Sequence, residues 1–231
     1  MLRLICLVLL VLVCSANAQE WAPWPTDHWA ESTPEAQGLD SALLQQADEY
    51  IRTQCPTRHT FLVIRNGYLV FERYYLGHSS ETESATASIS KNFISALVGI
   101  ALDKGLIRNT DQRVLEFFPE YASVFNDPRK TEIRLRHLLS MTAGFVPLGS
   151  DGWGGSNDWF RWILARPMAN NPGEVFDYNL GLYHVLAGIV AKTSGQTVPD
   201  FASRNLFQPL GIRDPRWELA PLGYYTGLYD L

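Results

Sequence analysis

Cysteine is scarce in this 231-residue chain, which contains only three. Cys6 and Cys14 fall within the first 18 residues, a segment that we expect to be removed, so Cys55 is left without a partner. A single cysteine cannot form an intramolecular disulfide. Because Pro56 follows it and neither a helix start nor a histidine accompanies it, we interpret Cys55 as a small, half-buried apolar residue rather than a catalytic thiol.

Basic residues are also few, with 19 Lys and Arg against 24 Asp and Glu and a net charge of −5 at pH 7. They do not cluster beyond Arg129-Lys130, so we expect no nucleic-acid partner. The five histidines lack the spacing of metal ligands, so we expect no zinc site. Internal repeats and low-complexity tracts are missing too, which favours one domain or part of one.

The first 18 residues have the order of a secretory signal peptide: a charge at Arg3, apolar residues 4–13, and small residues ending at Ala18. This apolar stretch is well short of the roughly 18 residues that a spanning helix needs. We therefore expect cleavage after Ala18 and a periplasmic or secreted protein, residues 19–231, without an integral membrane segment. A lipid on Cys14 is the less favoured alternative, because no small residue directly precedes it.

The remaining sequence predicts a strand pair followed by helices. Asp40 is placed to cap a helix that runs through Ile51. Asn66-Gly67 lies between two apolar runs, which predicts a hairpin over 61–71. We expect further helices over 88–104, 133–141, 158–165, 179–195 and 201–207. Strands separated from a block of helices favour an α+β or mixed α/β fold with a helical subdomain.

Ser88-Ile89-Ser90-Lys91 stands at the head of an apolar run and predicts a nucleophile with its base. Side chains three apart lie on one face of a helix, so the Ser88 hydroxyl and the Lys91 amine can share a hydrogen bond. A neutral lysine can then take the serine proton, and the N–H groups at the helix start lie beside the developing oxyanion. The alternative is an ordinary amphipathic helix with an exposed lysine in its first turn.

Several ordered blocks resemble the β-lactamase-related serine hydrolases, which include class C β-lactamases, D-Ala-D-Ala carboxypeptidases, esterases and 6-aminohexanoate-dimer hydrolases. The resemblance covers about residues 61–231. Its blocks are Ser88-Ile89-Ser90-Lys91, the segment 133–144 that holds Leu138-Leu139-Ser140-Met141-Thr142-Ala143-Gly144, Pro172-Gly173 with Phe176-Asp177-Tyr178, and Phe207-Gln208-Pro209-Leu210-Gly211. It implies a penicillin-binding-protein-like transpeptidase fold, with an antiparallel sheet and a helical subdomain, and chemistry that needs no cofactor.

The resemblance also implies that Tyr178 shares in proton transfer between the serine and the leaving group. The sequence departs from the family's Tyr-x-Asn-type motif at its third position, which is usually Asn or Ser but is Leu180 here, while Asn179 stands one residue earlier. Asn179 is therefore a candidate substrate-binding residue, although capping of the following helix is its simpler role.

Some other motifs are expected to be structural. Lys192-Thr193-Ser194-Gly195 has the letters of a Lys-Thr-Gly strand, but it ends a predicted helix. Ser156-Asn157-Asp158 is expected to cap a helix, and His137 and His184 are expected to be packed or hydrogen-bonded.

In the related family, a stretch like 223–228 is followed by a long segment with a Lys-Thr-Gly or His-x-Gly strand, whereas only Tyr229-Asp230-Leu231 follow here. That strand normally supplies one of two oxyanion donors, and its loss costs on the order of 10² to 10³ in rate. We therefore expect the C-terminal strands of the domain to be missing, and the chain as given to be poorly soluble or nearly inactive.

Two functional hypotheses follow. The first is an exported serine hydrolase that cleaves a small ester or amide, or a β-lactam or D-peptide, through a Ser88 acyl-enzyme with Lys91 as base and Tyr178 as relay. The second is an inactive remnant or binding module of the same fold, which would bind cell-wall peptides or amides through Trp153, Trp159 and Trp162. The sequence indicates no oligomeric state and does not identify the acyl bond. The segment 158–186 resembles the dimer-hydrolase and esterase side of the family, which favours esters and small amides over β-lactams.

Overall fold

The structure is a computed structural model that describes residues 22–25, 28–82, 87–147, 156–213 and 215–217. The expected signal peptide, Trp153 and the stretch 223–228 lie outside the described residues. The chain divides into two compact units, residues 1–81 and 82–231. Each unit is described by itself.

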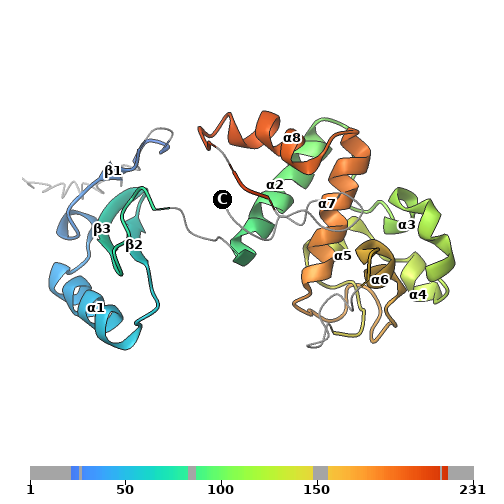
Figure 1. Cartoon of the computed structure of the whole chain (residues 1–231), viewed down its shortest axis with the longest axis horizontal. Helices are drawn as coiled ribbons and strands as arrows, with labels where there is room; N and C mark the ends of the chain where they lie inside the picture. Colours follow the sequence, from blue (N-terminus) through green and yellow to red (C-terminus); the bar gives the residue numbers. More distant parts are fainter. Residues whose placement is uncertain (1–21, 26–27, 83–86, 148–155, 214, 218–231) are drawn as a thin grey trace, which may run out of the picture. The chain divides into compact units, whose positions relative to one another are not determined.

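The first unit combines a helix with a three-stranded sheet (Figure 1). Helix α1 spans Ser41–Gln54, and the carboxylate of Asp40 accepts hydrogen bonds from the N–H groups of Ala42 and Leu43, as the sequence predicted. Strands β2 (Thr60–Arg65) and β3 (Tyr68–Tyr74) pair antiparallel around Asn66-Gly67. Both turn residues have positive φ, 54° and 81°, which confirms the predicted hairpin.

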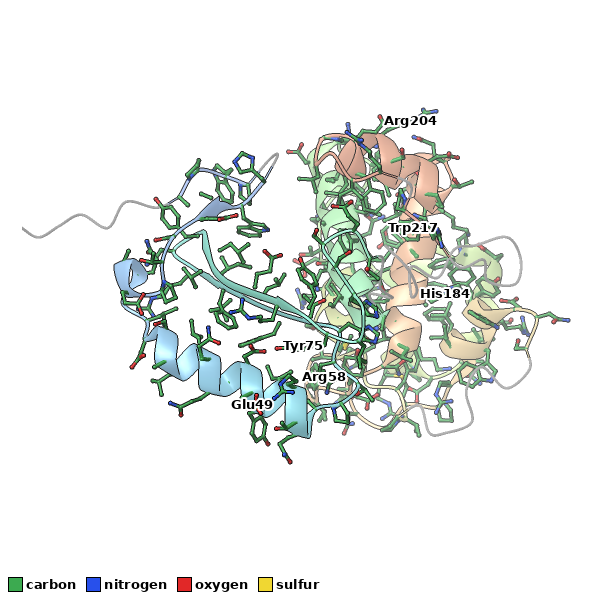
Figure 2. The ribbon with its side chains drawn as sticks, turned by 60° about the vertical axis from the view of Figure 1, so that its left-hand side comes forward. Glu49, Arg58, Tyr75, His184, Arg204 and Trp217 are labelled. Atoms are coloured by element: carbon green, nitrogen blue, oxygen red, sulfur yellow. The ribbon has the colours of Figure 1, made fainter. Side chains whose placement is uncertain are left out.

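A short strand that the sequence analysis did not predict completes this sheet. Strand β1 (Ala30–Glu31) pairs parallel with β3, so the strand order is β1-β3-β2. A 3₁₀ turn, η1 (Glu35–Gln37), leads from it towards α1. The carboxylate of Asp48 on α1 accepts hydrogen bonds from Arg73 at 3.2 Å and from the hydroxyl of Tyr75 at 2.7 Å, which ties the end of β3 to the helix (Figure 2). Burial, together with this bond, raises the pKa of Tyr75 to about 12.

The second unit is helical, and its two longest helices pack against each other. Helix α2 spans Ser90–Asp103 after a 3₁₀ turn η2 (Ala87–Ile89), and α7 spans Leu180–Ser194. Figure 1 shows α7 surrounded by shorter helices. The shorter helical elements in the described part of this unit are α3 (Val114–Phe117), η3 (Pro119–Val124), α4 (Pro128–Thr131), α5 (Leu135–Leu139), α6 (Trp159–Ala165), α8 (Val198–Ala202) and the π turn η4 (Ser203–Phe207). Of these, α3, α5, α6 and α8 contact α7.

Helix α7 is the centre of the core of this unit. All residues from Gly181 to Val190 are buried, as expected for a helix that is apolar on every side. It ends at Gly195, whose φ of 65° provides the left-handed cap that the sequence predicted. At Gly188 an added Cβ would lie 2.3 Å from Cε1 of Phe160, so α6 approaches α7 closely here.

Candidate active site

Ser88 lies in the 3₁₀ turn η2, directly before α2, and is exposed. The preceding residue, Ala87, has a φ of 44°, in the left-handed region that L-residues adopt at a cost of about 1–2 kcal/mol. The hydroxyl of Ser90, which is 4% exposed, donates a hydrogen bond of 2.6 Å to the carbonyl of Ala87. Ser90 therefore holds the strained turn that presents Ser88, a role that the sequence analysis did not assign to it.

Lys91 lies beside Ser88, as the spacing predicted. Its Nζ atom is 3.0 Å from Oγ of Ser88, within hydrogen-bond reach for proton transfer. Ser88 belongs to the 3₁₀ turn rather than to the first turn of α2, and in a 3₁₀ turn side chains three apart are eclipsed, which brings the two groups together. Lys91 is only 6% exposed, so the alternative of an exposed lysine is wrong.

Tyr178 joins this pair from a distant part of the sequence. Nζ of Lys91 lies 5.4 Å from the centroid of the tyrosine ring. A hydrogen bond with Ser88 lowers the pKa of Tyr178; burial opposes this effect, and a hydrogen bond with Lys91 and its charge add to it. The structure thus brings the three candidate catalytic residues, Ser88, Lys91 and Tyr178, into one cluster.

Asn179, the candidate substrate-binding residue, is buried, whereas the neighbouring Tyr178 is exposed. It is 1% exposed, and its Oδ1 atom accepts a hydrogen bond of 3.0 Å from the N–H of Gly181. It therefore caps α7, and substrate binding by its amide stays a prediction that this burial does not favour. Leu180, which replaces the expected polar residue, is the first residue of α7 and is 36% exposed.

The motifs expected to be structural have structural contacts. Lys192, in the last turn of α7, donates a hydrogen bond of 3.1 Å to the carbonyl of Phe117. Asp158 caps α6 by accepting from the N–H of Arg161 at 2.9 Å. Nδ1 of His137 accepts from the N–H of Arg134 at 3.1 Å. His184 stacks on the ring of Phe160 at 4.5 Å inside the helical unit (Figure 2).

Two tryptophans of the alternative hypothesis are engaged within the helical unit. The ring of Trp159 contacts the His184 ring edge-on at 5.4 Å, and the guanidinium of Arg166 lies 5.0 Å from the centroid of the Trp162 ring. Neither tryptophan is fully exposed. These contacts give the tryptophans a packing role and do not favour a ligand-stacking surface.

The described residues contain neither a candidate metal cluster nor a candidate membrane-spanning helix. No group of three or more His, Cys, Asp or Glu side chains there is arranged to hold a metal ion. No helix among them has both the length and the apolar composition needed to cross a membrane.

Comparisons with known proteins agree on one family. The sequence model of the family described as Beta-lactamase matches residues 59–229, and so covers parts of both units. The chain is 25% identical over 187 residues to 6-aminohexanoate-dimer hydrolase of Paenarthrobacter ureafaciens, covering 74% of this chain and 47% of that protein. It is 24% identical over 215 residues to esterase EstB of Burkholderia gladioli, covering 80% of this chain and 54% of the esterase.

The octameric penicillin-binding protein homologue from Pyrococcus abyssi has a similar structure, with a TM-score of 0.62 and 21% identity over 78% of this chain and 45% of that one. This similarity shows the β-lactamase and penicillin-binding-protein fold, as the sequence analysis expected. The chain spans about half the length of the curated relatives that it matches.

Proposed function

The chain belongs to the Beta-lactamase family, and from this premise we propose that it is a serine hydrolase that cleaves an ester or amide through an acyl-enzyme on Ser88. The observation that supports this most is the contact of 3.0 Å between Nζ of Lys91 and Oγ of Ser88, beside a Tyr178 ring whose centroid lies 5.4 Å from the same Nζ and whose pKa is lowered by Ser88 and Lys91. Nucleophile, base and relay within hydrogen-bond reach are the arrangement that acyl transfer requires.

The proposed reaction has two proton-coupled halves. As Oγ of Ser88 attacks the carbonyl carbon, the amine of Lys91 takes the hydroxyl proton, and the N–H of Ser88 serves as one donor to the oxyanion. The cation and Tyr178 then return a proton to the leaving alcohol or amine as its bond to carbon breaks. Water attacks the acyl-enzyme by the reverse route, which releases the acid and restores Ser88.

The names of relatives inform the proposed substrate class. One is an esterase and another hydrolyses an aminohexanoate dimer, so we prefer esters and small amides over β-lactams. A chromogenic short-chain ester, an anilide and a chromogenic cephalosporin, offered to residues 19–231, would rank the three bonds. We expect the ester to be hydrolysed fastest.

The experiment that tests the proposal compares Ser88→Ala with Ser95→Ala, a change at an exposed serine of α2. We expect Ser88→Ala to abolish ester hydrolysis, because no acyl-enzyme can form, and Ser95→Ala to leave it unchanged. Equal activity in the two variants would contradict the proposal.

An inactive binding module is the second candidate, because Leu180 stands where the family motif usually has a polar residue. It predicts tight binding of an amide ligand without turnover by the wild-type chain. Saturable binding of such a ligand, measured by calorimetry together with undetectable hydrolysis, would favour this candidate over the enzyme.

Export is part of the same proposal. The order of charge, apolar stretch and small residues in 1–18 supports cleavage between Ala18 and Gln19. Intact mass of the exported protein tests this proposal. A chain that still begins at Met1, or a diacylglyceryl group on Cys14, would contradict it.

A further inference from the structure

The position of Tyr178 needs an explanation, because its side chain is 53% exposed. Packing of the ring therefore does not fix the hydroxyl against Ser88 and Lys91. The backbone on either side of it is fixed instead. The N–H of Asp177 donates a hydrogen bond of 2.9 Å to the carbonyl of Met141, and on the other side the buried Asn179 caps α7.

The segment 167–177, which leads to Tyr178, is bonded along its length to the loop 141–146 that follows α5. Phe145 and Met168 form an antiparallel bridge. The backbone hydrogen bonds are Val146 N–H to Pro167 O at 2.9 Å, Ala169 and Asn170 N–H to Gly144 O at 2.8 and 3.1 Å, Gly173 N–H to Thr142 O at 2.8 Å, and Asp177 N–H to Met141 O.

This loop has two unusual backbone positions, and each provides one of the accepting carbonyls. Met141 has a φ of 54°, a conformation that a long side chain adopts only when its surroundings hold it there. Gly144 has a φ of 85°, and an added Cβ would lie 2.5 Å from the carbonyl oxygen of Asn170. A contact this short cannot form, so any side chain at 144 must push the 167–177 segment away from the loop.

We propose that Met141 and Gly144 are positioning residues for Tyr178. They act through the loop 141–146, whose backbone hydrogen bonds hold the segment 167–177 that precedes the tyrosine. Neither residue touches the serine. Their carbonyls fix Asn170 and Asp177, and so fix the distance from which the tyrosine side chain reaches Ser88 and Lys91. The inference rests on the proposed function only in giving Tyr178 a part in proton transfer.

The first test is Gly144→Ala, matched with Gly195→Ala. Both glycines have positive φ, so both changes cost backbone strain, but the Cβ at 195 meets nothing within 4 Å. A difference between the two variants therefore reports the clash with Asn170 rather than the strain.

The second test removes a single hydrogen-bond donor. Asp177→Pro deletes the N–H that bonds to Met141, and Asp177→Ala removes the same side chain but keeps that N–H. This pair decides the question if Gly144→Ala fails to fold.

The readout is the pH titration of Tyr178, taken as the tyrosinate absorbance of each variant minus that of its Tyr178→Phe partner. We expect Gly144→Ala and Asp177→Pro to move the midpoint upward, because a displaced hydroxyl loses its bond with Ser88, while both control variants keep the wild-type midpoint. Where turnover is measurable, kcat should fall about 10- to 100-fold with KM nearly unchanged, as small misplacements of a reacting group do.

This readout separates the two proposals. If Tyr178→Phe retains full activity, the relay role fails, and the titration still decides whether the loop positions the tyrosine. A folded Gly144→Ala or Asp177→Pro with an unchanged midpoint would overturn the inference. Loss of folding in Asp177→Pro, beside a folded Asp177→Ala, would also overturn it, because the bond would then serve stability alone.

Discussion

Replacing Lys91 by methionine should change activity and stability in opposite directions. Lys91→Met keeps most of the length and apolar stem of the side chain but removes the amine that lies 3.0 Å from Oγ of Ser88. A positioned general base contributes about 10²- to 10⁴-fold to a rate. At about 1.4 kcal/mol for each factor of ten, the barrier to acylation should rise by about 3–5 kcal/mol.

The stability of Lys91→Met should not fall together with its activity. Lys91 is 6% exposed, and replacing a buried ionisable group by an apolar one of similar volume is often neutral or stabilising. The hydroxyl that loses its partner belongs to Ser88, which is exposed and can bond to water. We therefore expect the free energy of unfolding to stay the same or to rise by about 1 kcal/mol.

The assay measures ester hydrolysis and denaturant unfolding of Lys91→Met beside Lys104→Met, which makes the same change at the exposed C-terminal cap of the same helix. Lys104→Met should keep the wild-type rate. The pKa of Tyr178 should also rise in Lys91→Met, since one of the groups that lower it is gone, although the bond with Ser88 remains the larger cause. A folded Lys91→Met with more than a tenth of the wild-type rate would refute the role of Lys91 as base.

Three further predictions concern the helical unit. Burial lowers the pKa of His184 from 6.5 to about 4, and the charge of Asp158 opposes this shift. Between these two pH values the unfolded chain therefore binds more protons than the folded chain. The free energy of unfolding should fall by up to about 3 kcal/mol as the pH drops from 6.5 to 4. Denaturant unfolding of His184→Leu should show a smaller fall, and an equal one would contradict this. Gly188→Ala should lower the free energy of unfolding by about 1–3 kcal/mol, because the added Cβ clashes with Phe160. Gly99→Ala, which has open space around it, should raise that free energy by about 0.5–1 kcal/mol. Thermal unfolding measures both, and a change of the same sign in the two variants would refute the role of packing. Asn179→Ala should lower the free energy of unfolding by about 1 kcal/mol, whereas Asn179→Asp should keep the wild-type value because aspartate also caps helices. A raised KM in Asn179→Asp would instead support substrate binding by the amide.

Local signals made much of the fold predictable from the sequence. Asp40 caps α1 and Asn66-Gly67 turns the hairpin, because each acts through contacts or dihedral angles within a few residues. The left-handed glycine after α7, Gly195, was predictable for the same reason. The two-residue strand β1 was not predicted, since its pairing with β3 depends on residues far apart in the sequence and on no pattern of its own.

The residues of the candidate site were predictable from the sequence, but the backbone conformations and hydrogen bonds that hold them in place were not. Spacing brought Ser88 and Lys91 together, and the family resemblance added Tyr178. The strained backbone at Ala87, the bond from Ser90 that holds it, and the left-handed conformation of Met141 have no signature in composition or periodicity. Such conformations persist because tertiary contacts impose them, so only the three-dimensional structure reveals them.

Ser88 is the proposed nucleophile on which the mechanism depends most, and the most direct measurement is the site of covalent labelling. A serine-reactive phosphonate forms a stable adduct at an activated hydroxyl, and peptide mapping by mass spectrometry locates it. We predict one adduct on the peptide that contains Ser88, which is absent in Ser88→Ala and formed about 10²- to 10⁴-fold more slowly in Lys91→Met. An adduct on Ser90 or Ser95, or labelling that persists undiminished in Ser88→Ala, would contradict the account.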